Sequence, residues 1–193
     1  MDGEPAPVVL IVGDSLSAGY GIDLSQRWTA LLQQRFDEQG YEYRVVNASI
    51  SGDTTSGGLT RLPTALSKFE PALVVIELGG NDGLRGLPIR TMRKNIEGMI
   101  ELSNEAGARV ALLGMRIPTN YGQRYADSFH AVYATLAQRL NTALVPFFLE
   151  GVAQDKSMMQ SDGIHPNAGA QARLLDNAWP AIVDGLAAWC AAL

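Results

Sequence analysis

Five short, mainly apolar runs recur along the chain. Runs of this length that are apolar on successive positions are typical of strands buried on both faces of a parallel sheet. The predicted strands are Val8–Gly13, Arg44–Ala48, Ala72–Leu78, Arg109–Met115 and Ala143–Pro146. This pattern favours a sheet covered on both faces over a one-sided antiparallel sheet.

Between these runs, apolar residues recur with the spacing of amphipathic helices. The predicted helices are Gln26–Gln39, Thr60–Phe69, Ile89–Ala106 and Ala126–Leu140, followed by one helix or a pair of helices within Asn167–Ala191. Alternating strands and helices imply right-handed crossovers and an open sheet with helices on both faces. Because the sequence contains no internal repeat or linker, we expect a single α/β domain over residues 1–193.

Composition narrows the classes of partner. The chain is 47% hydrophobic and 18% charged, with a formal net charge of -5 and no cluster of Lys or Arg, so nucleic acid and anionic membranes are disfavoured. No apolar run approaches the roughly 20 residues of a membrane-spanning helix, so stable insertion is not expected. The first residues lack the pattern of a secretory leader. A protein from which such a leader had been removed would look the same, so an exported origin stays open. The lone Cys190 cannot form an internal disulfide, and we expect it to be buried. A monomer is the default expectation.

Ligands of open parallel sheets bind at the carboxyl ends of the strands, so residues that directly follow strands are the candidates for chemistry. Gly13-Asp14-Ser15-Leu16-Ser17-Ala18-Gly19 follows the first strand. A serine in such a turn could act as a nucleophile, although the segment alone is equally consistent with a glycine-rich turn. We interpret Ser15 as the nucleophile, Asp14 as a turn-stabilising residue and Ser17 as a helix cap, with Ser17 as the alternative nucleophile if Ser15 is buried.

Two further loops contain small polar residues. Asn47–Thr54 follows the second strand, and its Gly52 could offer an unobstructed backbone N–H. Gly79-Gly80-Asn81-Asp82-Gly83 follows the third strand, and Asn81 could donate its side-chain amide into a site. Each loop alone is also consistent with a plain turn.

Only two histidines are present, so only two residues could be a histidine base. His130 lies in a helical pattern and is best explained as a surface or packing residue. His165 lies in a loop, three residues after Asp162, which could orient one ring nitrogen and leave the other facing a hydroxyl. A metal site is disfavoured, because this Asp–His pair has no second His or Cys nearby in the sequence.

Taken together, these blocks resemble the GDSL, or SGNH, hydrolase family. The match rests on Ser15 in Gly-Asp-Ser-Leu-Ser, on Gly52, on Asn81 in Gly-Gly-Asn-Asp, and on His165 in Asp-Gly-Ile-His-Pro-Asn, in the family's order. Longer strings such as Glu-Leu-Gly-Gly-Asn-Asp-Gly-Leu-Arg-Gly resemble the bacterial thioesterase I, protease I and lysophospholipase L1 branch and its arylesterase relatives.

The resemblance implies a flavodoxin-like three-layer α/β/α sandwich with a five-stranded parallel sheet and no cofactor. It implies hydrolysis of acyl-thioesters, aryl esters and lysophospholipids by Ser15, His165 and Asp162, with the N–H groups of Ser15 and Gly52 and the Asn81 side chain as oxyanion hole. Members of this branch are commonly exported to the periplasm; a cytoplasmic location is not excluded. Residues expected to line an acyl groove are Leu84, Ile117, Pro118 and Tyr121. We expect Arg116 to pair with a carboxylate rather than bind substrate.

Two alternatives remain open. One is an enzyme of the same family with a different substrate, and the other is a protein without catalytic activity. A carbohydrate O-acetyl esterase could use the same blocks, but Trp28, Trp179 and Trp189 fall in helical patterns, which places aromatic sugar platforms away from the predicted catalytic loops. A non-catalytic flavodoxin-like binding module would not react with a fluorophosphonate at Ser15.

Overall fold

The computed structural model describes residues 5–192 and has one sheet of five parallel strands. The strands are β1 (Val8–Gly13), β2 (Arg44–Asn47), β3 (Leu73–Glu77), β4 (Arg109–Leu113) and β5 (Ala143–Val145). Their order in the sheet is β2-β1-β3-β4-β5, which is the flavodoxin-like order. The predicted fold class is therefore confirmed, and each predicted strand is present with ends that differ by at most two residues.

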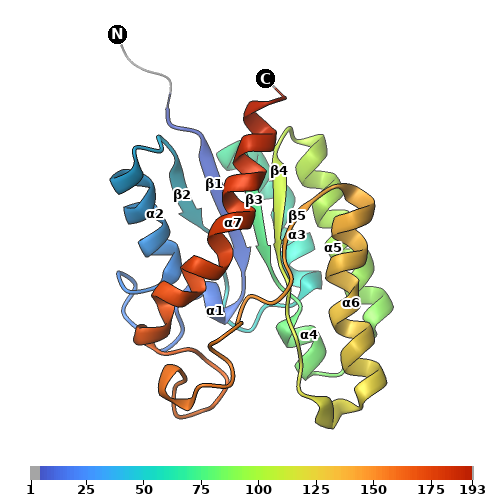
Figure 1. Cartoon of the computed structure of the whole chain (residues 1–193). Helices are drawn as coiled ribbons and strands as arrows, with labels where there is room; N and C mark the ends of the chain where they lie inside the picture. Colours follow the sequence, from blue (N-terminus) through green and yellow to red (C-terminus); the bar gives the residue numbers. More distant parts are fainter. Residues whose placement is uncertain (1–4, 193) are drawn as a thin grey trace.

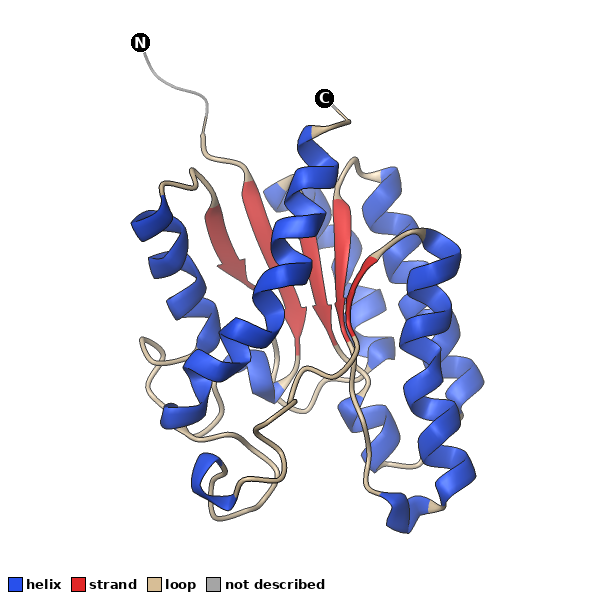
Figure 2. Cartoon of the chain, viewed as in Figure 1, coloured by secondary structure: helices blue, strands red, loops and turns tan. Residues whose placement is uncertain are grey.

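Helices cover both faces of this sheet (Figures 1 and 2). The helices are α1 (Ser15–Ala18), α2 (Trp28–Gln39), α3 (Thr55–Phe69), α4 (Gly80–Leu84), α5 (Ile89–Glu105), α6 (Gln123–Leu140) and α7 (Gln171–Cys190). Helices α2 and α7 pack together on one face, whereas α3, α5 and α6 pack in sequence on the other. Short 3₁₀ turns occupy Thr119–Tyr121, Lys156–Met158 and Ala168–Ala170.

Strands β1 and β3 are neighbours in the middle of the sheet, and they are buried on both faces. Every residue of both strands is buried, and all of them except Glu77 at the end of β3 are apolar, as expected for strands covered on both faces. Their carboxyl ends meet where the strand order reverses, and the short helices α1 and α4 begin there (Figure 1). In folds of this order, that reversal point is where ligands bind.

Several predicted details are corrected by the structure. Helix α3 begins at Thr55, five residues before the predicted start, and α7 is one helix that contains Pro180. The loop predicted at Gly79–Gly83 is largely the short helix α4. Cys190 is exposed at the end of α7 rather than buried, because that last turn extends past the edge of the core. Within the described residues, no helix combines the length and the apolar character required to cross a bilayer.

Candidate active site

Ser15 is the first residue of α1 and directly follows the turn at the end of β1. The Asp14 carboxylate caps this helix by accepting the Leu16 N–H at 3.0 Å, which is the turn-stabilising role predicted for it. Gly13 is required immediately before, because a Cβ there would lie 2.7 Å from Glu77 Oε2 and 2.8 Å from the Ser17 side chain. This tight turn leaves Ser15 half-buried at the carboxyl edge of the sheet.

His165 reaches Ser15 from the loop that precedes α7. Its Nε2 lies 2.9 Å from Ser15 Oγ, and its Nδ1 lies 2.7 Å from Asp162 Oδ2. With Nδ1–H donating to Asp162, Nε2 is left as the acceptor for the serine proton. Tyr20 packs against the imidazole, with ring centroids 4.5 Å apart. His130 lies on α6 instead, with Nδ1 3.2 Å from the Met115 carbonyl oxygen, as expected for a packing residue.

Asp162 is held ionised by its own loop. One of its oxygens accepts the backbone N–H groups of Ile164 and His165, while the other faces the imidazole. The hydrogen bonds from His165, together with the one from Ile164, lower the pKa of Asp162 to about 2. Asp162 therefore carries its negative charge across the ordinary assay range and can stabilise a cationic His165.

The predicted oxyanion donors lie in three segments that hydrogen bonds connect: Ser15 begins α1, Gly52 lies in the loop after β2, and Asn81 lies in α4. Asn81 Nδ2 donates to the Asp53 carbonyl oxygen at 2.9 Å and to Asp14 Oδ2 at 3.0 Å, so it links the residue after Gly52 to the residue before Ser15. Both amide hydrogens of Asn81 are thus directed at protein acceptors, and an oxyanion would have to share or replace one of these bonds. Gly52 has φ +79°, and among residues 5–192 no acceptor is bonded to its N–H.

Replacing Asn81 by alanine tests its predicted donor role. We expect kcat on a p-nitrophenyl ester to fall by about 10²–10³, because one oxyanion donor is lost where negative charge develops. Asn104→Ala, on the exposed surface of α5, is the matched control and should leave kcat unchanged. Wild-type kcat in Asn81→Ala would mean that Asn81 only braces Asp14 and Asp53.

A cavity of about 340 Å³ opens beside Ser15 and His165, and we call it the Ser15 cavity. Leu84, Ile117 and Pro118 line it, as predicted for an acyl groove. Tyr121, which was predicted to line the groove, does not line this cavity: its side chain is exposed and its hydroxyl donates to the Leu84 carbonyl oxygen at 3.0 Å. The Ser15 cavity is also lined by residues that were not predicted from the sequence, including Met115, Leu149, Ala153, Met159 and Ile164.

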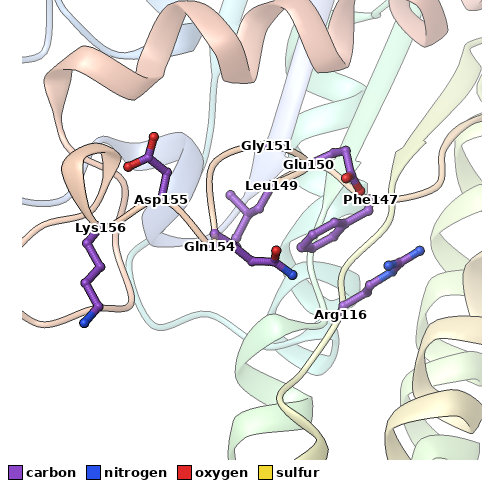
Figure 3. A pocket seen from close by; sticks show the side chains of 9 residues that line it. Arg116, Phe147, Leu149, Glu150, Gly151, Gln154, Asp155 and Lys156 are labelled. Atoms are coloured by element: carbon purple, nitrogen blue, oxygen red, sulfur yellow. The ribbon is translucent and has the colours of Figure 1, made fainter.

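A second cavity, of about 410 Å³, adjoins the first and is called here the Phe147 cavity (Figure 3). The two cavities share Arg116, Leu149 and Ala153 as lining residues. Arg116 has no carboxylate partner among the described residues, contrary to prediction; its guanidinium carbon lies 5.1 Å from the centroid of the Phe147 ring. This arrangement is a cation–π contact, and the exposed arginine lines both cavities.

Polar groups beneath the nucleophile turn were missed or misassigned from sequence. Ser17 is fully buried and donates to Glu77 Oε2 at 2.6 Å, so it is neither the helix cap nor an accessible alternative nucleophile. Trp28 Nε1 donates to Ser17 Oγ at 3.2 Å, so this tryptophan lies directly under the turn rather than away from the catalytic loops. Trp28 is fully buried and cannot serve as a sugar platform. The sequence feature that could have drawn attention to Glu77 is its position as the only charged residue in an otherwise apolar strand.

A serine hydroxyl bonded to a histidine whose other nitrogen faces a carboxylate, at the ligand edge of a flavodoxin-like sheet, defines an α/β serine hydrolase. The chain belongs to the GDSL-like lipase/acylhydrolase family, whose model matches residues 11–173. The resemblance predicted from the four sequence blocks is confirmed.

Two similar proteins and one solved structure show which members of this family the chain resembles. The chain is 56% identical over 177 residues to "Esterase TesA" of Pseudomonas aeruginosa, covering 92% of this chain and 88% of that protein. It is 44% identical over 171 residues to "Thioesterase 1/protease 1/lysophospholipase L1" of Escherichia coli K12, covering 89% of this chain and 81% of that protein. A solved crystal structure of TesA superimposes with a TM-score of 0.89 at 56% identity, covering 91% of this chain and 97% of the other.

Proposed function

We propose that this chain hydrolyses small acyl esters and thioesters through a covalent acyl-enzyme on Ser15. One observation carries the proposal: the Ser15 Oγ–His165 Nε2 contact of 2.9 Å lies at the wall of a cavity lined largely by apolar side chains. A nucleophile with its base needs only an acyl carbon nearby, and the apolar cavity offers a place for the acyl chain. The names of the two relatives, an esterase and a thioesterase, support the same substrate class.

The geometry supports the following sequence of steps. His165 Nε2 accepts the Ser15 proton as Oγ attacks the acyl carbon, and Asp162 stabilises the resulting imidazolium. The backbone N–H groups of Ser15 and Gly52 and the amide of Asn81 receive the oxyanion. His165 then protonates the departing thiol or alcohol. Water repeats the attack on the acyl-enzyme, releasing the acid and restoring the Ser15 hydroxyl.

Two measurements test this proposal against its rivals. Incubation with a fluorophosphonate, followed by peptide mass mapping, should show one adduct on Ser15; an unlabelled protein would support a binding module instead. A panel of acyl-CoA thioesters and p-nitrophenyl esters should be hydrolysed faster than acetylated sugars. A preference for the acetylated sugars would favour the carbohydrate esterase, although no tryptophan is among the residues that line the Ser15 cavity.

The lining residues that the two cavities share give a prediction about acyl-chain length. Because Ala153 lines both cavities, a long acyl chain that extends from the Ser15 cavity into the Phe147 cavity would pass beside its small side chain. A bulky side chain in Ala153→Phe should block this route. Excluding three methylenes at about 0.8 kcal/mol each would lower kcat/KM for the longest esters by about 50-fold.

The measurement is kcat/KM for p-nitrophenyl esters from acetate to palmitate. Acetate and butyrate hydrolysis should be unchanged in Ala153→Phe, and Ala153→Ser should keep the wild-type profile across the panel. An equal decrease at every chain length would mean that the variant perturbs the Ser15 cavity itself rather than a passage beyond it.

We also propose a periplasmic location and a monomeric state. The support for the location is the resemblance to a branch whose members are commonly exported; for the monomer it is the acidic, globular composition. Cell fractionation tests the first, with recovery in the cytoplasm as the contrary result. Light scattering of the purified chain tests the second.

A further inference from the structure

Glu77 is a fully buried carboxyl group directly beneath the nucleophile turn. It is the last residue of β3 and pairs in register with Gly13, the last residue of β1. Its Oε2 accepts the Ser17 hydroxyl at 2.6 Å and the Asp14 backbone N–H at 3.3 Å. These two donors come from the residues immediately before and two positions after Ser15. The carboxyl group therefore holds the turn through hydrogen bonds on both sides of the nucleophile.

The contacts of Glu77 are those of a carboxylic acid rather than a carboxylate. Because Trp28 Nε1 donates to Ser17 Oγ, the hydroxyl proton of Ser17 is free to be directed at Glu77. Oε2 thus receives two donors, as a carbonyl oxygen does, whereas Oε1 is buried and has no hydrogen-bond partner. No ion pair involving Glu77 occurs among residues 5–192. A buried charge without a cation and with one bare oxygen is strongly unfavourable, so a proton on Oε1 is the arrangement that fits.

The surrounding titratable groups act in the same direction. Asp14 faces Glu77 from the turn before α1. The hydroxyl of Tyr133 on α6 donates to the carbonyl oxygen of Leu78, the residue after Glu77, and the Glu77 and Asp82 charges both raise the pKa of Tyr133. Burial, and then the nearby Asp14 charge, raise the pKa of Glu77 well above its ordinary value. Burial likewise raises the pKa of Asp14 to about 6. None of these neighbours is a cation that would hold Glu77 ionised.

We infer that Glu77 is a positioning residue, kept as a neutral acid, that fixes the Asp14–Ser17 turn and so sets the place of the Ser15 hydroxyl. The inference rests on the proposed function of Ser15 for its catalytic part. It extends to Asn81, because the Asp14 carboxylate that Glu77 helps to place accepts the Asn81 amide. Glu77 touches neither substrate nor Ser15 Oγ; it acts through the backbone of Asp14 and the side chain of Ser17.

The catalytic part is tested with Glu77→Gln and Glu77→Met. Glutamine keeps a carbonyl oxygen for both donors without a charge, so kcat should stay within about threefold of wild type, with the acid limb of its pH profile unmoved. Methionine leaves both donors without an acceptor, and the shifted turn should lower kcat by about 10²-fold with KM nearly unchanged. Wild-type kcat in a folded Glu77→Met protein overturns the positioning role. A displaced acid limb in Glu77→Gln overturns the neutral-acid assignment, because it would mean that the wild-type carboxyl group is charged.

A milder variant covers the case in which Glu77→Met does not fold. Ser17→Ala removes one of the two donors while keeping Glu77 and the Asp14 N–H. It should lower kcat by about tenfold, since the turn loses one of its two anchors. Unchanged turnover in Ser17→Ala would overturn the inference, because the hydroxyl contact would then have no effect on the nucleophile.

The neutral state of Glu77 is tested by thermal unfolding, which does not depend on any activity. A folded pKa above the ordinary 4.5 means that the folded state holds a proton that the unfolded chain releases, so stability falls as pH rises above about 4.5. Asp14 contributes a decrease of the same sign between its ordinary 3.8 and about 6 in both proteins. Glu77→Gln removes only the first contribution.

Above pH 4.5, the slope of Tm against pH should therefore be less negative in Glu77→Gln than in wild type, by up to about 3 °C per pH unit. Equal slopes in the two proteins would show that Glu77 is already ionised in the folded state, which overturns the neutral-acid assignment. A failure of the proposed esterase function would leave this result intact, so the two outcomes can be told apart.

Discussion

Replacing Ser15 by alanine is expected to lower kcat/KM on p-nitrophenyl esters by about 10⁴–10⁶, because the covalent route through the acyl-enzyme is closed. Among the described residues, the only hydrogen bond of the Ser15 hydroxyl is with His165, so its removal breaks no hydrogen bond that holds α1 in place. The far-UV circular dichroism spectrum and the Tm should remain those of the wild type. Residual turnover would reflect the oxyanion donors and binding alone.

A matched control sharpens this result. Ser128→Ala removes a hydroxyl from an exposed position on α6, and it should keep full activity and fluorophosphonate labelling. Ser15→Ala should lose labelling along with activity. Full activity in Ser15→Ala would exclude Ser15 as the nucleophile. Because Ser17 is fully buried, such a result would require a nucleophile other than the two serines of the Asp14–Ser17 turn.

The parts of the fold that the sequence predicted well are those in which hydrophobic period and burial agree. β1 and β3 are buried throughout, so their apolar runs are unambiguous. The short helices α1 and α4 were missed because four or five residues are too few to show a helical period. Helix α3 begins earlier than predicted because tertiary packing outweighs the low helix propensity of glycine: a Cβ at Gly58 would lie 2.3 Å from Leu78 Cδ1.

The candidate site likewise contains some residues that could be predicted from the sequence and some contacts that could not. Ser15, His165 and Asp162 could be selected because few residue types perform this chemistry. Ser15 closely follows a predicted strand, and the other two lie in the loop before the last helix. Contacts between segments that are far apart in the sequence could not be predicted from the sequence. The bond of Tyr121 to the Leu84 carbonyl and the stacking of Arg116 on Phe147 depend on how the loops fold over one another. The buried partners of Glu77 lie 60 and 63 residues away in the sequence.

The His165–Asp162 pair carries the second of the largest expected effects. His165→Ala removes the base and should lower kcat/KM by about 10⁴–10⁶, whereas His130→Ala, the matched control on α6, should remain within about twofold of wild type. Asp162→Asn is expected to cost less than His165→Ala but still about 10³–10⁴, because an amide facing Nδ1 favours the tautomer with its proton on Nε2, opposite Ser15.

The pH dependence separates orientation from charge at Asp162. The pKa of Asp162 is about 2, so between pH 5 and 9 its carboxylate does not titrate, and any acid limb in that range belongs to another group. If Asp162 acts only by orienting the ring, Asp162→Asn keeps the wild-type acid limb at reduced height. Its charge also stabilises the imidazolium, however, and loss of that charge moves the acid limb to lower pH. We therefore expect a lower and acid-shifted profile, measured as kcat/KM from pH 4.5 to 9. Equal and complete losses in Asp162→Asn and His165→Ala would instead mean that His165 has no function as a base without the carboxylate beside it.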